Sequence, residues 1–135
     1  MLTLLDIKDV AGINMECFGR DDSYSDYRVL LELDNTPGNG ILVHKEKGTI
    51  AGYLVYSNTT EGLTTVRMGT TYYYRGKGIA KKLIRKILKQ AKEQKVAFKT
   101  YISLDNISSI NAHIGVGLKI IAVEDKEWVW VGTSY

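Results

Sequence analysis

The spacing of apolar positions separates predicted helices from predicted strands along this chain. The clearest helix begins near residue 79, where apolar residues recur every three or four positions and basic residues fill the remaining face. Its apolar stripe consists of Ile79, Leu83, Ile84, Ile87, Leu88 and Ala91. A stripe of this width on a charged helix indicates that the helix lies on a sheet.

The pattern is weaker in the N-terminal part. Residues 2–5 are predicted as a short strand, followed by a helix that Asp6 caps and that ends near Cys17. Asn14 interrupts the apolar face of this helix. A second helix is predicted over residues 24–33.

Alternating apolar and β-branched runs predict the strands, and the polar turns between them predict hairpins. The strands are expected at residues 41–44, 50–56, 63–71, 96–103, 120–123 and 128–131, with a short helix at 108–116. This order predicts an α/β fold, in which helices cover both faces of a mixed, largely antiparallel sheet.

Length and composition narrow the class of protein. The chain has 135 residues, of which 44% are hydrophobic and 24% charged, so we expect one globular domain over residues 1–135. No apolar stretch approaches the roughly 20 residues of a membrane-spanning helix, and the first residues lack a secretory pattern. We therefore expect a cytoplasmic protein without a membrane partner.

Cysteine and histidine are scarce. Cys17 is the single cysteine, and only His44 and His113 accompany it, so an internal disulfide is excluded and no metal site is predicted. Acyl transfer through a thiolate would need a nearby base, so Cys17 is interpreted as a packing residue.

Charge is polarised along the chain. Residues 1–34 contain eight acidic and three basic side chains, whereas residues 75–95 contain nine basic side chains and one acidic one. One end therefore suits a cation and the other an anion, although solvated helix faces produce the same asymmetry. The lysine-rich helix lacks interleaved aromatic residues, so no nucleic-acid partner is expected.

A glycine-rich segment, Arg75–Ala80, lies between a predicted strand and the long helix. Helix N-terminal amides lack internal partners and lie at the positive end of the helix dipole, so a pyrophosphate would fit there. The alternative is an ordinary glycine-rich turn. The spacing of a P-loop is absent, and Gly78 is not followed by the third glycine of a dinucleotide fingerprint.

Two motifs carry a resemblance to a known family. The segment Arg75–Ala80 resembles the Gln/Arg-x-x-Gly-x-Gly/Ala loop that binds the acetyl-CoA pyrophosphate in the GNAT N-acetyltransferases. A downstream signature of this family, Asn-x-x-Ala/Ser-x-x-x-Tyr/His-x-x-x-Gly-Phe/Leu, is similar to the series Asn106, Ser109, His113, Gly117 and Leu118. The resemblance implies a GNAT-like fold, and acetyl-CoA as the acetyl donor.

The same resemblance implies a set of residues that bind acetyl-CoA. Backbone amides of the loop would hold the pyrophosphate, with charge from Arg75 and Lys77, and the pantetheine arm would lie where the strands at 63–71 and 96–103 diverge. The set comprises Met68, Gly69, Thr70, Arg75, Gly76, Lys77, Gly78, Ile79, Ala80, Asn106 and Ser109. Lys81 and Lys82 are either close to the 3′-phosphate or solvated helix charges.

The expected reaction is direct attack of a primary amine on the thioester. His113 occupies the position of the family's proton donor to the leaving thiolate, and packing is its alternative role. Threonines 64 and 65 stand near the usual position of the family's glutamate base, so the candidates for this role are Glu61, the tyrosines at 72–74 and an ordered water that relays the proton. Without a base, the chain would be an acyl-CoA-binding regulatory module with little turnover.

The acceptor amine is predicted only as a class, either a small molecule or a protein amine. The candidate residues for an entrance that attracts this cation are Asp21, Asp22, Tyr24 and Asp26. Trp128 and Trp130 share one face of the last strand, where they either pack in the core or form the contact of a homodimer.

Overall fold

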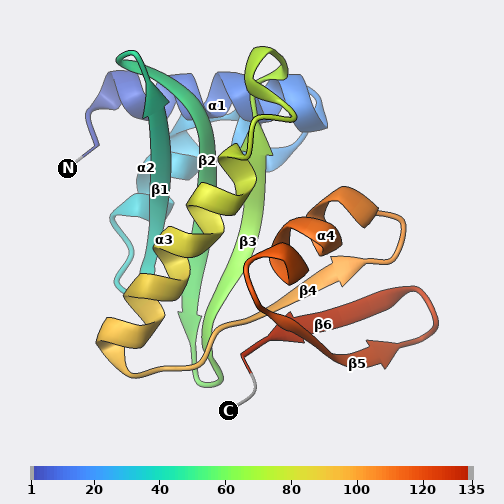
Figure 1. Ribbon diagram of the computed structural model, residues 1–135. Helices are drawn as coiled ribbons and strands as arrows, with labels where there is room; N and C mark the ends of the chain where they lie inside the picture. The colour runs from blue at the N-terminus through green and yellow to red at the C-terminus, as the bar shows by residue number, and fades with distance from the viewer. Residues whose placement is uncertain (1, 134–135) are drawn as a thin grey trace.

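The computed structural model describes residues 2–133 and contains two antiparallel sheets of three strands each (Figure 1). The first sheet has the order β1–β2–β3, with β1 at Asn39–Glu46, β2 at Thr49–Thr59 and β3 at Gly62–Thr70. The second has the order β4–β6–β5, with β4 at Lys99–Ser103, β5 at Lys119–Glu124 and β6 at Trp128–Gly132.

Helices cover both faces of the first sheet, as Figure 1 shows. The α-helices are α1 (Leu4–Phe18), α2 (Tyr27–Asp34), α3 (Ile79–Gln94) and α4 (Ile107–Gly115), and the short 3-10 helices are η1 (Ser23–Ser25) and η2 (Tyr72–Tyr74). Helices α1 and α2 lie on one face of this sheet and α3 lies on the other, while α4 packs beside the second sheet.

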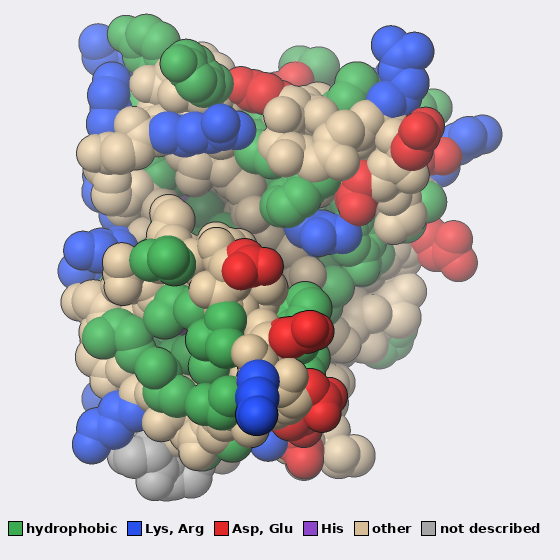
Figure 2. All heavy atoms as spheres, turned by 90° about the vertical axis from the view of Figure 1, so that its right-hand side faces the viewer, with side chains coloured by type: hydrophobic (Ala, Val, Ile, Leu, Met, Phe, Trp, Pro, Cys, Tyr) green, Lys and Arg blue, Asp and Glu red, His purple; other side chains and the backbone are tan. Residues whose placement is uncertain are grey.

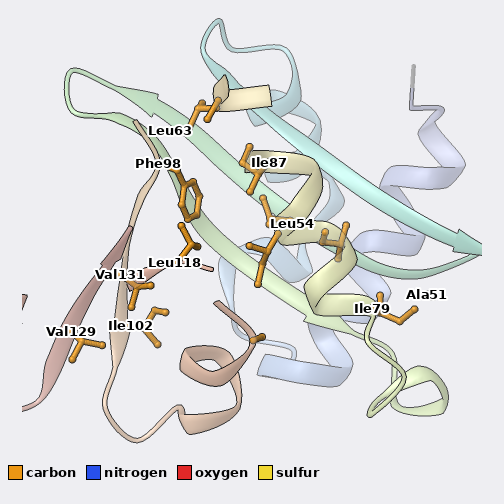
Figure 3. Close-up of a cluster of buried hydrophobic side chains, with 14 residues drawn as sticks. Ala51, Leu54, Leu63, Ile79, Ile87, Phe98, Ile102, Leu118, Val129 and Val131 are labelled. Carbon is orange, nitrogen blue, oxygen red and sulfur yellow. The ribbon is translucent and has the colours of Figure 1, made fainter. Parts of the chain in front are cut away.

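Neighbouring residues of β2 contribute to two separate hydrophobic cores. Tyr53 packs with apolar residues of α1, and Leu54 packs with those of α3. Figure 3 shows that the larger core continues past α3 to the second sheet, because Phe98, Leu118 and Val131 belong to the same cluster as Leu54. The alternation of side chains along a strand therefore places β2 between both helical layers.

The α/β class, the antiparallel pairing and the helices on both faces are confirmed. The predicted single sheet is divided into two, because no ladder joins β3 to β4 among residues 2–133 and an isolated parallel bridge links Leu63 to Phe98, just before β4. The long helix, the short helix and both hairpins are confirmed within a few residues, while the strand predicted from residue 96 begins only at Lys99.

The strand predicted for residues 2–5 is wrong, and so is the cap at Asp6. Helix α1 already begins at Leu4, because the Thr3 hydroxyl accepts the N–H of Asp6 and the Asp6 carboxylate accepts the N–H of Thr3, at 3.1 and 2.9 Å. This reciprocal pair is a capping box that starts the helix one turn earlier than expected. Helix α2 starts later than predicted, at Tyr27, where the side chain of Asp26 caps it.

Candidate functional site

A cleft of about 920 Å³ opens where β3 and β4 diverge. At the closed end of this fork, the N–H of Leu63 donates to the carbonyl of Ala97 at 2.9 Å, and the Thr100 hydroxyl donates to the carbonyl of Thr65 at 3.3 Å. Beyond these contacts the two strands separate, and both of them line the cleft together with α4 and the loop before α3. The cleft therefore lies between the two sheets.

The loop before α3 leaves open space at its glycines. Gly76 and Gly78 have φ angles of +75° and +80°, and a Cβ added to either would meet no atom within 4 Å. Gly78 is also the N-cap residue of α3 and provides no side chain to cap it. The free N–H groups of the first turn are thus available to an anion that enters the cleft.

Arg75 is fixed beside this loop. Its Nε donates to the carbonyl of Thr70 at 3.1 Å, and its Nη2 donates to the Sγ of Cys17 at 3.3 Å. The half-buried thiol of Cys17 in turn donates to the same Thr70 carbonyl at 3.4 Å. Cys17 therefore packs against Arg75 and lines the cleft, whereas the Lys77 ammonium lies 4.5 Å from the ring centre of Tyr73 and does not line it.

Most residues of the predicted acetyl-CoA set come together in the cleft. Apart from Lys77, all of them line it, on β3, on the loop, in the first turn of α3 and at the start of α4. Asn106 is the N-cap of α4, and its Oδ1 accepts the N–H of Ser109 at 3.2 Å. Lys81 also lines the cleft, while Lys82 pairs with Glu46 at 3.3 Å on the surface.

His113 is buried in the wall of the cleft, with its ring stacked on Phe98 at a centroid distance of 6.3 Å. Its Nδ1 lies 2.6 Å from the carbonyl of Ser109, and a carbonyl can only accept a hydrogen bond. Nδ1 therefore carries the proton, and Nε2 carries a lone pair. Burial lowers the pKa of His113, which favours this neutral form.

Three buried side-chain polar atoms among residues 2–133 have no hydrogen-bond partner: Thr65 Oγ1, Arg67 Nε and His113 Nε2. All three residues line the cleft. Buried polar atoms are rarely left without partners, because each one costs about 1–3 kcal/mol. Their gathering around one cleft is typical of a site whose ligand or water supplies the missing hydrogen bonds.

Glu61 lies outside the cleft. It occupies the turn between β2 and β3, at the closed end of the fork, where it pairs with Lys99 at 3.4 Å and its side chain is 66% exposed. The cleft is lined by Arg67, Arg75 and Lys81 but by no aspartate or glutamate of the described chain, residues 2–133. A carboxylate base is therefore absent from the walls formed by these residues.

The predicted entrance residues are also placed beside the cleft rather than in its wall. Asp22 pairs with Arg67 at 2.8 Å, and Asp26 pairs with Arg28 at 2.9 Å, so both carboxylates already have cationic partners. The ring centre of Tyr24 lies 5.5 Å from the guanidinium of Arg67. Asp21 is exposed.

Sequence reasoning missed the polar network that holds Arg67. Inside α1, Asn14 accepts a hydrogen bond from the phenol of Tyr53 and donates to Asp22 Oδ2 at 2.8 Å. Burial raises the pKa of Tyr53, so the phenol stays protonated and acts as a donor. The interruption of the apolar stripe by Asn14 was the one signal of this network in the sequence.

Neither a metal site nor a membrane span emerges from the described residues. Within residues 2–133, no group of three or more His, Cys, Asp or Glu side chains is arranged to hold a metal ion. The helices in the same part of the chain are too short or too polar to cross a membrane.

Comparison with known proteins points to one family. A sequence model of the Acetyltransferase (GNAT) family matches residues 7–117. No curated protein matches the chain by sequence. Among solved structures, the ribosomal-protein-alanine N-acetyltransferase from Brucella melitensis is similar with a TM-score of 0.79 and 18% identity, over 98% of this chain and 96% of that one.

Two further structures share the fold. Ard1 from Thermoplasma volcanium has a TM-score of 0.78 and 17% identity, over 98% of this chain and 93% of its own. The yncA structure from Salmonella typhimurium with its cofactor acetyl-CoA has a TM-score of 0.76 and 17% identity, over 98% of this chain and 90% of its own.

Proposed function

The chain belongs to the GNAT family of acetyl-CoA-dependent N-acetyltransferases, and from this premise we propose that its cleft transfers the acetyl group directly to a primary amine. The observation that carries the proposal is the convergence of an open glycine loop and three unpartnered buried polar atoms on one cleft. These features suit a ligand that brings both an anion and hydrogen-bonding groups.

The donor substrate is held along the length of the cleft. The first-turn amides of α3 bind its pyrophosphate, with added charge from Arg75, because a Cβ at Gly76 or Gly78 would meet nothing and backbone can approach there. The outer edge of β3, at Met68, Gly69 and Thr70, pairs with its amide-containing arm. At the other wall, Asn106 and Ser109 border the arm from α4.

The acceptor must attack as a neutral amine, and the cleft favours that form. Arg67, Arg75 and Lys81 line it, and no aspartate or glutamate of residues 2–133 does, so a protonated amine is disfavoured. Asp22 and Asp26 pair with arginines, and among residues 2–133 Asp21 is the entrance carboxylate without an ion-pair partner. The acceptor class remains a primary amine of a small molecule or a protein.

His113 is the proton carrier. Its neutral ring offers the lone pair of Nε2, so it accepts the proton that the amine loses as the C–N bond forms. When the C–S bond breaks, the resulting imidazolium returns this proton to the thiolate. The role of proton donor that the family pattern implies is thus preceded by a role as acceptor.

A second candidate function is binding of an acyl-CoA with little turnover. The observation that favours it is the position of Glu61 outside the cleft, because a carboxylate base is then missing from the described walls. The two functions share the donor site and differ only in catalysis.

One experiment separates these functions and tests the site. Acetyl-CoA binding is measured by calorimetry, and release of free thiol is followed with a panel of small amines, amino acids and peptides. The panel includes a peptide with an N-terminal alanine, since the similar structure from Brucella melitensis is a ribosomal-protein-alanine N-acetyltransferase. Binding with turnover supports the enzyme, binding without turnover on any amine supports the regulatory module, and absence of binding contradicts both.

The matched variants are Gly78→Asp and Gly48→Asp. Both glycines have φ near +80° and open space around a Cβ, and aspartate tolerates this conformation better than most residues. Only Gly78→Asp places a carboxylate at the proposed pyrophosphate site, so we expect it to weaken acetyl-CoA binding by about 100-fold or more. If the two folded variants bind acetyl-CoA with equal affinity, the pyrophosphate does not bind at this loop.

A further inference from the structure

Strand β5 is an uncovered edge of the second sheet. All six of its residues, Lys119–Glu124, are exposed, and no strand of residues 2–133 pairs with its outer side. The edge strand β1 of the first sheet is protected, because Lys86 Nζ donates to the carbonyl of Val43 at 2.9 Å. Exposed apolar edges of this kind readily join another chain.

The pairing of β5 with β6 decides which side chains share a face. Ile120 lies opposite Val131 and Val123 lies opposite Val129, and both valines are buried, so these two β5 residues belong to the inner face. Lys119 lies opposite Gly132 and Glu124 lies opposite Trp128. These two therefore belong to the outer face.

A β-bulge at Ile121 is responsible for this arrangement. In a regular strand, residues 119 and 124 would point to opposite faces, because side chains alternate. The register shift between Ile120 and Ala122 inserts one extra residue, so the charged ends of β5 share one face and the apolar pair shares the other.

We propose that β5 is the contact of a homodimer, in which a second copy of the chain places its own β5 alongside in antiparallel orientation. A two-fold axis between Ile121 and Ala122 would set Lys119 of each copy against Glu124 of the other. The same axis sets Ile120 against Val123. Opposite charges at the two ends and apolar residues between them make this strand complementary to itself.

The apolar side chains supply the area to be covered. Ile120, Ile121 and Val123 are 51%, 50% and 60% exposed. Figure 2 shows apolar side chains gathered on the lower half of the face that carries the second sheet. The bulge limits additional backbone hydrogen bonds, so side chains make most of the contact. A contact of one strand edge is small, and the dimer is expected to be weak.

Sedimentation velocity over a series of protein concentrations tests the proposal. We expect the wild-type chain to pass from monomer to dimer as its concentration rises. Lys119→Glu sets like charges against each other, and so does Glu124→Lys, so each should raise the dimer dissociation constant about tenfold or more. The double variant Lys119→Glu/Glu124→Lys reverses both charges and should return within about threefold of the wild type.

The control is Lys89→Glu, which changes the net charge as Lys119→Glu does but lies at an exposed position of α3. It should leave the dimer unchanged. A monomer at every concentration overturns the proposal, as does an assembly larger than a dimer, because a two-fold contact closes at two copies. A dimer that both single charge variants leave intact also overturns it, since the contact must then lie elsewhere.

Discussion

The two sheets differ in how they are covered. In the first sheet, β2 is enclosed by helices on both sides, and Tyr53 and Leu54, which point to opposite sides, are both fully buried. In the second sheet, Val129 and Val131 of β6 face the core, while Trp128 and Trp130 stack with Tyr101 on the outer face. The first sheet is thus buried on both faces, whereas the second sheet is buried on one face only.

This difference explains where the cleft forms. The first sheet fixes one wall on β3 and anchors the loop at Arg75, whereas the second sheet turns away after the single bridge at Phe98. Because β4 does not continue the first sheet, the outer edge of β3 is left facing the cleft. The site therefore depends on a break between sheets rather than on either sheet alone.

The largest effect is expected from truncating the core of the first sheet. Leu54→Ala removes a fully buried side chain and should lower the free energy of unfolding by about 2–5 kcal/mol. Ile120→Ala, on the half-exposed edge of the second sheet, should cost only about 0.5 kcal/mol when measured at high dilution. Urea denaturation checks both values, and similar losses would contradict the difference between the sheets.

The second prediction concerns His113, which packs between the sheets. His113→Phe keeps an aromatic ring against Phe98 but has no proton to carry, so kcat should fall about 100-fold, equivalent to about 2.7 kcal/mol. Acetyl-CoA affinity should stay within about threefold. His113→Tyr restores a titratable group and should recover part of the turnover. Normal turnover of folded His113→Phe would exclude the proton-carrier role.

The same residue predicts a pH dependence of stability. The folded-state pKa of His113 lies below its ordinary value of 6.5 because the ring is buried. Between the lowered folded-state pKa and the ordinary unfolded-state pKa, the unfolded chain binds more protons than the folded one. The contribution of the neutral His113 to stability is therefore fully present above pH 6.5 and is lost as the pH falls toward the folded-state pKa. Melting curves of His113→Phe should lack this part of the pH dependence.

A third, smaller effect compares two tyrosines, one from each sheet. Tyr53→Phe removes the donor to the buried Asn14 Oδ1 and should cost about 1–3 kcal/mol. Tyr101→Phe keeps the ring between two indoles, at centroid distances of 4.8 and 4.7 Å, and should cost within about 0.5 kcal/mol. Denaturation of the two variants measures the difference, and equal costs would mean that the network through Asn14 stabilises nothing.

Local patterns in the sequence predicted the elements well. The period of α3 and the turns of both hairpins depend on neighbouring residues, and these are visible in the chain itself. The capping box of Thr3 and Asp6 was missed, because the surrounding leucines also suit a strand. The division into two sheets could not be predicted. It depends on how far β3 pairs with the segment around β4, and the bridged residues Leu63 and Phe98 are more than 30 positions apart in the sequence.

The residues that line the cleft were predictable where they belong to a motif and not where only the fold brings them together. Gly78 and Asn106, which the resemblance predicts to bind acetyl-CoA, both line the cleft, and their role in binding stays a prediction. The pairing of Asp22 with Arg67 joins residues 45 positions apart, and no local pattern indicates it. The protonated nitrogen of His113 is likewise decided by a backbone carbonyl that only the folded α4 brings into reach.

The smallest expected effect concerns Arg75, which anchors the glycine loop to the end of β3 in the first sheet. Arg75→Ala removes a charge beside the proposed pyrophosphate, and we expect acetyl-CoA affinity to fall about tenfold, equivalent to about 1.4 kcal/mol. Stability should change little, because the Arg75 side chain donates to the Thr70 carbonyl and the Cys17 thiol in an exposed setting. Lys89→Ala, on the exposed face of α3, is the control for loss of one positive charge.

Calorimetry at rising salt concentration sharpens the test, since screening should weaken acetyl-CoA binding by the wild type more than binding by Arg75→Ala. An affinity that neither salt nor the loss of Arg75 changes would place the phosphates away from this loop, and the break between the sheets would then not be the donor site.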